Sequence, residues 1–274
     1  MSSITRDFRD LSTSGFIQNF QSFLKEGESS RFNKEEQSRL CCVISNCIQL
    51  LVQDLEAACE SALVAMIKVQ WSTIEVVGDQ SNYVNTIIVH LRQTIPTIRD
   101  RLSSCRKYFT QLCVKFASSF IVKLIQQLYK CKPLNTVGAE QLLLDVHMLK
   151  TALLDLPSTG YQVQRKAPAT YTKVVIKGIA TAEMILKLVM SPIESPNDFV
   201  KQCRMRLPDL QAPEFQKILD MKGLKKTEQI LLVEQFKQPD HSAASYNTSN
   251  IAQDSPEHEA GRIKRLEKLI KKRI

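Results

Sequence analysis

The stretch VNTIIVHLRQTIPTIRDRLSSCRKYFTQLCVKFASSF (residues 84–120) decides the fold of this chain of 274 residues. Its apolar side chains recur every three or four positions over about five heptads, the period of a helix that buries one face. These positions are Val84, Ile87, Leu91, Ile95, Ile98, Leu102, Cys105, Phe109, Leu112, Phe116 and Phe120. Pro96 removes one helical hydrogen bond and crowds the preceding turn, so a kink or break is expected there. Beyond it, the helix is predicted to continue to about Lys130.

Further stripes of the same period lie on both sides of this stretch. They cover residues 35–68, 142–156 and 171–189, and each predicts an amphipathic helix. In the last of them, Gly178 and Ala182 are small enough to let a neighbouring helix approach closely. Shorter helices are predicted near residues 197–206, 213–221 and 224–236.

The chain is therefore predicted to be all-α, with tandem helical bundles that form a rod segment. Pro133, Asn135 and Gly138 mark a loop between the bundles. Residues 237–261 contain almost no large apolar side chains, which predicts a disordered linker. The predicted organisation is a short N-terminal helix and loop (1–33), a first bundle (34–131), a second bundle (138–236), the linker (237–261) and a basic amphipathic tail helix (262–274).

The eight cysteines mostly lie within apolar helical patterns, and no C-x-x-C spacing occurs. Free, buried thiols in a reducing compartment are therefore predicted rather than disulfides. Residues 1–10 carry charges without an apolar core, which is unlike a signal peptide. No uninterrupted apolar run reaches the roughly 18 residues that a membrane span needs. These observations predict a cytosolic protein.

The net charge of +9 is concentrated at the end of the chain. Residues 262–274 hold seven basic side chains and one acidic one, so they carry six of the nine excess positive charges. Basic side chains opposite an Ile/Leu face suit a partner helix or an anionic membrane surface. A solvated, frayed helix and nucleic-acid binding are the alternatives. No aromatic residue lies among the basic ones to stack on bases, which disfavours nucleic acid.

The sequence contains no motif of a catalytic or cofactor site. The closest two glycines are twelve residues apart, so a glycine-rich phosphate loop is excluded. The four histidines have no spacing typical of a metal site, and no nucleophile signature surrounds a cysteine. We therefore expect no enzyme activity, no cofactor and no metal.

Two further features have both a functional and a structural interpretation. Glu140, Asp145 and Asp155 share a helix with His147, and paired carboxylates can carry out acid–base chemistry. A solvated helix face is the expected explanation for these carboxylates. Trp71, the only tryptophan, can anchor an interface, but a position in or beside the core is expected.

Several strings of residues resemble the vacuolar protein sorting-associated protein 53 family. They are LLVQDLEAACESALVAM (50–66), VGDQSNYV (77–84), IRDRL (98–102), RKYFTQLCVKFA (106–117), KCKP (130–133), GAEQLLLD (138–145), LLDLP (153–157), RKAPATYTKVVIKG (165–178), AEMILKLVM (182–190), FQKILDMKGLK (215–225) and RIKRLEKLIKKRI (262–274). The resemblance covers most of residues 40–236 and the tail. These strings encode packing rather than chemistry.

The resemblance implies a helical, non-enzymatic subunit of the Golgi-associated retrograde protein (GARP) and endosome-associated recycling protein (EARP) tethering complexes. Such a subunit acts in retrograde transport from endosomes to the trans-Golgi network and in endosomal recycling. The implied partners are sister subunits in a hetero-oligomer, fusion proteins, small GTPases and the anionic surfaces of trans-Golgi network and endosome membranes. The family also has a long N-terminal coiled-coil region that this chain lacks, so a fragment, a short isoform or a truncated gene product is expected.

The predicted contact residues are basic side chains near the loop at residues 157–168 and in the tail. Clustering near a loop motivates the first group, and the amphipathic pattern motivates the second. The two groups are Arg165, Lys166, Lys173 and Lys177, and Arg262, Lys264, Arg265, Lys268, Lys271 and Lys272. A basic helical protein that binds nucleic acid with steep salt dependence is the alternative function.

Overall fold

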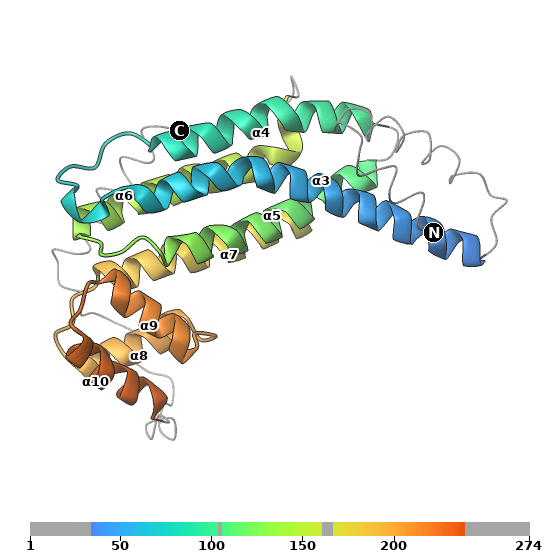
Figure 1. The fold of residues 1–274 in the computed structure, drawn as a ribbon. Helices are drawn as coiled ribbons and strands as arrows, with labels where there is room; N and C mark the ends of the chain where they lie inside the picture. Colours follow the sequence, from blue (N-terminus) through green and yellow to red (C-terminus); the bar gives the residue numbers. More distant parts are fainter. Residues whose placement is uncertain (1–33, 104–105, 161–166, 239–274) are drawn as a thin grey trace. The chain divides into compact units, whose positions relative to one another are not determined.

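The computed structural model describes residues 34–103, 106–160 and 167–238, which form helices without any strand (Figure 1). The long helices are α3 (Lys34–Lys68), α4 (Asn82–Arg101), α5 (Arg106–Leu128), α6 (Thr136–Asp155) and α7 (Ala169–Met190). The shorter elements in this part of the chain are α8 (Pro196–Arg206), α9 (Ala212–Met221), α10 (Lys226–Lys237) and the 3₁₀ turns η1 (Trp71–Thr73) and η2 (Leu156–Ser158). The prediction of an all-α bundle is confirmed. The predicted N-terminal helix, the tail helix and all but the first residues of the linker lie outside the described residues.

The apolar stretch at residues 84–120 forms two helices that separate after Arg101 and not at Pro96. Helix α4 continues through Pro96, so a break at the proline is wrong, and a kink there stays a prediction. A proline removes only one helical bond, while Ile95 and Ile98 are 0% and 2% exposed and hold this part of α4 in the core. The chain turns instead after Arg101.

The described residues group into two compact units, each assembled from separate segments of the chain. Unit 1 comprises residues 34–65, 82–124 and 149–178, and unit 2 comprises residues 66–81, 125–148 and 179–238. Helices α3, α5, α6 and α7 each contribute residues to both units. The predicted division of the chain into successive bundles at 34–131 and 138–236 stays a prediction.

Unit 1 contains a close approach of α5 and α7. A Cβ atom added at Gly178 on α7 would lie 2.9 Å from Cγ2 of Ile121 on α5, so this separation requires glycine. Tyr171 and Val175 are fully buried, whereas Val174, which belongs to the predicted stripe, is only half-buried. The close approach predicted at Gly178 is confirmed, and the buried face of α7 is rotated slightly from the predicted one.

Unit 2 contains Trp71, whose side chain is 2% exposed, as predicted for a core position. Its indole Nε1–H donates to the carbonyl oxygen of Met66 at 2.9 Å. A Cβ atom added at Gly138 would lie 2.2 Å from the carbonyl oxygen of Trp71, so the start of α6 packs directly on this backbone. The Gly138 N–H donates to Asn135 Oδ1 at 2.6 Å. Gly138 therefore belongs to the first turn of a helix and not to the predicted loop, because Asn135 caps α6.

The three short helices of unit 2 begin and end within about two residues of the predicted bounds (Figure 1). Phe215 lies between two other aromatic rings, with centroids 6.2 Å from Phe199 and 4.4 Å from Phe236. The guanidinium of Arg204 lies 5.4 Å from the Phe236 ring and donates to the carbonyl oxygens of Phe236 and Gln238 at 2.7 and 2.6 Å. Aromatic stacking and one arginine thus hold α10 on α8 and α9.

Helix α5 is the one helix of the described residues that is long and apolar enough to cross a membrane by length and composition. Its residues Leu112, Cys113 and Phe116 are 0% exposed, and Lys115 and Lys123 interrupt its apolar sequence. A helix that buries a broad apolar face inside a bundle has the same composition. The burial of α5 therefore agrees with a place in the helical core.

Candidate interaction surfaces

Lys173 and Lys177 lie one turn apart on the exposed side of α7, with Ile176 46% exposed between them. Their exposure follows from the helix period, since Tyr171 and Val175 occupy the buried side. The structure thus places two of the predicted contact residues on one surface. The other predicted contact residues, Arg165, Lys166, Arg262, Lys264, Arg265, Lys268, Lys271 and Lys272, lie outside the described residues.

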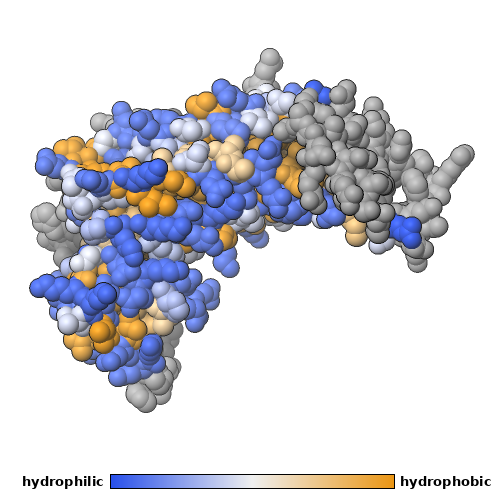
Figure 2. Space-filling view, viewed as in Figure 1, coloured by the Kyte–Doolittle hydropathy of each residue, from blue (hydrophilic) through white to orange (hydrophobic). Residues whose placement is uncertain are grey.

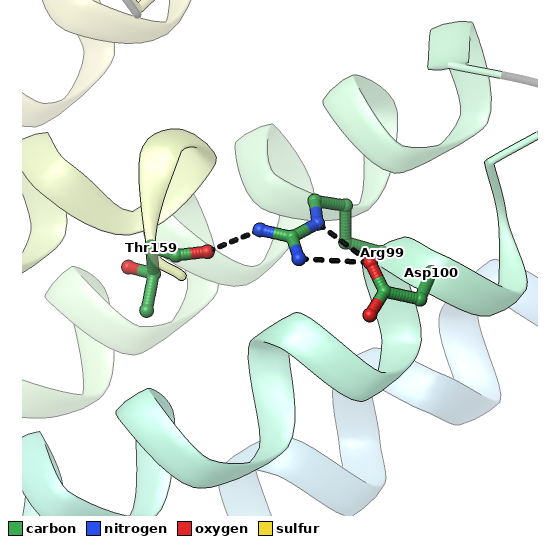
Figure 3. A network of polar contacts seen from close by, with 3 residues as sticks. All are labelled: Arg99, Asp100 and Thr159. Atoms are coloured by element: carbon green, nitrogen blue, oxygen red, sulfur yellow. Dashed lines mark hydrogen bonds and ion pairs between the residues drawn. The ribbon is translucent and has the colours of Figure 1, made fainter. Parts of the chain in front are cut away.

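Arg99 on α4 binds the chain where the predicted loop at residues 157–168 begins (Figure 3). Its Nη1–H donates to the carbonyl oxygen of Thr159 at 2.5 Å, and its Nε–H and Nη2–H donate to the Asp100 carboxylate at 3.0 and 2.8 Å. Only 12% of the Arg99 side chain is exposed. Gly160 follows with a φ of 78°, a conformation that favours glycine. This network fixes the position of the chain at the end of η2.

Two side chains of α6 hold the segment between η1 and α4. Gly78 N–H donates to Gln141 Oε1 at 2.8 Å, and Gln141 Nε2–H donates to the carbonyl oxygen of Asp79 at 2.8 Å. Asp145 Oδ1 accepts from Ser81 N–H at 2.9 Å and from Gln141 Nε2–H at 3.3 Å. Gln141 is 5% exposed and Asp145 is 0% exposed. Because buried polar groups need partners, these hydrogen bonds define the course of the segment.

The burial of Asp145 corrects the prediction that the carboxylates near His147 form a solvated helix face. Glu140 is 8% exposed and Asp145 is 0% exposed, and of the three carboxylates only that of Asp155 lies on an exposed residue. An apolar stripe indicates one buried face, but every residue from 138 to 146 is buried, so α6 is covered all round. Asp145 therefore serves as an acceptor for backbone and amide N–H groups.

A second meeting of distant segments occurs where the chain beyond α5 lies beside α9. Lys217 Nζ lies 5.2 Å from the centre of the Tyr129 ring. Lys132 Nζ lies 2.9 Å from Asp220 Oδ2. The hydrogen bond from Lys132 holds the pKa of the Asp220 carboxyl below its usual range. Residues 129–132 thus lie along α9 from Lys217 to Asp220.

The same neighbourhood continues past the end of α9. Leu134 N–H donates to the carbonyl oxygen of Met221 at 2.8 Å. Gly223 has a φ of 70°, and a Cβ atom added to it would lie 3.1 Å from Cβ of Pro133. The start of α10 is therefore brought to the segment that follows α5. We call the exposed lysines gathered here the lysine junction: Lys130, Lys132, Lys217, Lys225 and Lys226.

Lys222 lies between these exposed lysines in the sequence but points to the protein interior. Its Nζ donates to the carbonyl oxygens of Val189 at 2.8 Å, Ser191 at 2.5 Å and Leu188 at 3.4 Å. It also lies 5.3 Å from the centre of the Phe199 ring. These carbonyls end α7, where a positive charge offsets the negative end of the helix dipole. Lys222 therefore caps α7.

Helix α10 presents a surface of different chemistry. Ile230 and Leu231 are 57% and 60% exposed, and Figure 2 shows an apolar patch over α10. The exposed carboxylates of Glu228 and Glu234 lie one turn to either side of Leu231. This surface combines apolar and acidic groups, whereas the lysine junction is basic.

The thiols in the described part of the chain are mostly buried and unreactive. Burial raises the pKa of Cys47 to about 11 and raises those of Cys59, Cys113, Cys131 and Cys203 to about 12. Since the thiolate is the nucleophile, thiols of this kind are inert at neutral pH. Cys41 and Cys42 on α3 are exposed, which the apolar pattern did not predict. Within residues 34–103, 106–160 and 167–238, no group of three or more His, Cys, Asp or Glu side chains is placed to hold a metal ion.

Comparison with known proteins matches part of the region that builds these surfaces. The family model of the vacuolar protein sorting-associated protein 53 C-terminus matches residues 140–224. Residues 140–224 belong to this family. The match contains the two α6 side chains that hold residues 78–81, the α7 cap Lys222, and Lys217 and Asp220 of the lysine junction region.

Relatives of the vacuolar protein sorting-associated protein 53 family match well beyond this region. The Caenorhabditis elegans vacuolar protein sorting-associated protein 53 homolog is 42% identical over 194 residues, which are 71% of this chain and 24% of that protein. The Arabidopsis thaliana vacuolar protein sorting-associated protein 53 A is 37% identical over 202 residues, which are 74% of this chain and 24% of that protein. No solved structure matches this chain. The matched part thus spans about a quarter of the length of these relatives.

Four of the strings that resemble the vacuolar protein sorting-associated protein 53 family meet in pairs. VGDQSNYV (77–84) meets GAEQLLLD (138–145) at the hydrogen bond between Gly78 and Gln141, which are 63 residues apart. KCKP meets FQKILDMKGLK at the ion pair between Lys132 and Asp220, which are 88 residues apart. No local pattern pairs residues at such separations. The sequence analysis therefore did not predict the lysine junction, although KCKP and FQKILDMKGLK both contain lysines.

Proposed function

We propose that this chain is a non-enzymatic subunit of a vesicle-tethering complex in protein sorting. The observation that carries the proposal is the 42% identity over 194 residues to a vacuolar protein sorting-associated protein 53 homolog. The all-helical fold and the buried thiols of raised pKa support a role in binding rather than in covalent chemistry.

The proposed complexes are GARP and EARP, in which the chain forms a hetero-oligomer with sister subunits. In this role it is cytosolic and peripherally associated with trans-Golgi network and endosome membranes, and it serves retrograde transport and endosomal recycling. Fusion proteins and small GTPases are further proposed partners. Rigid helical bundles suit such a role, because surfaces on helices are held in fixed positions without any catalytic centre.

The proposed contacts of this chain are basic. On α7 they are Lys173 and Lys177, whose exposure on one face supports a contact with a partner or a membrane. The loop residues Arg165 and Lys166 and the basic side chains of residues 262–274 complete the proposal. Exposed lysines suit anionic surfaces, and the strength of such contacts falls as salt screens them.

Affinity purification of the tagged full chain from cells tests the assembly. We expect the sister subunits to be recovered, and a K173E/K177E variant to recover less than a matched K107E/K201E variant, since all four lysines are exposed. Failure of the unmodified chain to recover any sister subunit would contradict the assembly proposal. Equal recovery by both variants would remove the α7 lysines from it.

Vesicle flotation tests the tail, and a binding assay tests the alternative function. We expect the full chain to float with anionic vesicles better than a chain without residues 262–274. Equal flotation would remove the membrane role of the tail. The nucleic-acid alternative predicts binding to DNA or RNA that falls steeply with salt, and such binding at physiological salt would favour it over tethering.

A further inference from the structure

We propose that the lysine junction of unit 2 is a docking surface for an anionic membrane. It consists of different residues from the contacts predicted on α7 and in the tail. The surface exists only in the folded chain, because Lys130 and Lys132 follow α5, whereas Lys217 lies on α9. Vesicle binding by this surface does not depend on assembly into a tethering complex, so the two proposals succeed or fail separately.

The charge of the junction is positive after its acids are counted. All five lysines are exposed, and the nearby carboxylates are those of Asp220, which pairs with Lys132, of Glu228 at the start of α10, and of Glu214 near Tyr129. Five lysines against these three carboxylates leave an excess of two positive charges. The side chain of Lys132 remains 49% exposed within its ion pair. An excess of this kind attracts anionic headgroups within about one Debye length of the surface.

The residue types of the junction favour a membrane over other anionic partners. Its basic residues are all lysines, whose ammonium groups act as point charges, whereas site-specific phosphate recognition favours the bidentate geometry of arginine. A layer of lipid headgroups offers many charges without a fixed geometry, which lysines can follow. Tyr129 is 8% exposed and has Lys217 over its ring, so this aromatic residue is not available to stack on a nucleic-acid base.

The scaffold of the junction does not depend on the lysines to be changed. The backbone bond between Leu134 and Met221 and the contact between Pro133 and Gly223 hold the segments together. Lys225 and Lys226 lie at the start of α10, where a glutamate is favoured by the helix dipole. Substitutions to glutamate at these two positions should therefore leave the fold of unit 2 intact.

Co-flotation with vesicles tests the proposal in the full chain. The probes are neutral phosphatidylcholine vesicles and phosphatidylcholine vesicles that contain about one third phosphatidylserine, at low and at physiological salt. The test variant is K130E/K225E/K226E, and the matched control is R92E/K107E/K201E, which changes the net charge equally at exposed positions elsewhere. Because the basic tail also attracts anionic vesicles, every arm is repeated in a chain with K268Q, K271Q and K272Q. Circular dichroism and Tm establish that all variants are folded.

We expect the test variant to bind the anionic vesicles at least about tenfold more weakly, since each lysine near such a surface strengthens binding about fivefold. The control variant should change binding by less than about threefold. Equal losses in both variants would overturn the proposal, because binding would then follow net charge alone. Absence of vesicle binding once these three tail lysines are replaced would also overturn it. Binding of inositol hexakisphosphate without vesicle binding would assign the lysines to a soluble phosphate ligand and overturn the proposal of a membrane-docking surface.

Discussion

The close approach of two helices in unit 1 and the contacts of buried polar side chains in unit 2 differ in kind. In unit 1, α7 approaches α5 so closely that the backbone at Gly178 lies against the Ile121 side chain. In unit 2, buried polar side chains bind backbone groups of other segments: Gln141 and Asp145 hold the segment before α4, and Lys222 holds the end of α7. The first contact is steric and the second kind is electrostatic.

The difference teaches which contacts a sequence reveals. A small residue on an apolar stripe announces a close approach, because the stripe already predicts which face is buried. A buried aspartate or lysine looks the same in sequence as an exposed one, because its partners are backbone groups far along the chain. Five predictions test these contacts and the burial of the thiols, beginning with the largest expected effect.

Asp145→Ala should lower the free energy of unfolding by about 3 kcal/mol, because Ser81 N–H and the Gln141 amide lose a buried acceptor. Urea denaturation followed by circular dichroism measures this loss. Glu75→Ala, in the exposed part of the neighbouring segment, is the control and should cost less than about 0.5 kcal/mol. Equal costs would show that unit 2 does not depend on its buried carboxylate.

Gly178→Val should lower the free energy of unfolding by about 2 kcal/mol, since even a Cβ atom comes within 2.9 Å of the Ile121 side chain. If the contact is steric, Ile121→Ala should relieve part of this cost in the double variant. A double-mutant cycle by urea denaturation should then show a coupling of about 1 kcal/mol. Additive costs would contradict a direct contact between the two positions.

Lys222→Met should lower the free energy of unfolding by about 1 kcal/mol. The substitution keeps most of the apolar stem but removes the ammonium group that binds three carbonyls at the end of α7. Lys217→Met removes an exposed ammonium that lies over the Tyr129 ring and should lower the free energy of unfolding by only about 0.5 kcal/mol. A cost at Lys217 as large as that at Lys222 would place the stabilisation outside the α7 cap.

The reactivity of the cysteine thiols reports on the unfolding of each unit. Of the described thiols, Cys41 and Cys42 should react with a thiol reagent in the native protein, and the buried thiols only after unfolding. The buried thiols are Cys47, Cys59 and Cys113 in unit 1 and Cys131 and Cys203 in unit 2. If the thiols of unit 2 react at lower urea than those of unit 1, the units unfold separately. Simultaneous reaction would show that they unfold together.

The same thiols make the protein sensitive to alkali. Their ordinary pKa of 9.0 is raised by burial to about 11 for Cys47 and about 12 for Cys113. Between pH 9 and the raised pKa of each thiol, the unfolded state loses its thiol protons while the folded state keeps them. The free energy of unfolding therefore falls as pH rises above about 9. Urea midpoints measured from pH 8 to pH 11 should therefore decrease. A Cys113→Ala variant should lose less of its midpoint over the same range.

The sequence by itself determined the elements that depend on local period. It predicted a helix at residues 35–68, where α3 spans Lys34–Lys68, and three short helices whose positions match α8, α9 and α10. It also predicted the close approach at Gly178. Each of these depends on residues a few positions apart, which periodicity and residue size describe well. Of the candidate site, it identified only the exposed pair Lys173 and Lys177 among the described residues.

Only the tertiary structure decided the features that join distant segments. Pro96 stays within α4 because its buried neighbours hold the helix in the core, which outweighs one lost hydrogen bond. Asp145 is buried because α6 is covered all round, which a single apolar stripe does not show. The lysine junction arises where Lys132 and Asp220 meet across 88 residues of chain. Long-range contacts depend on how whole helices pack, so charges that are scattered in the sequence become a surface only after folding.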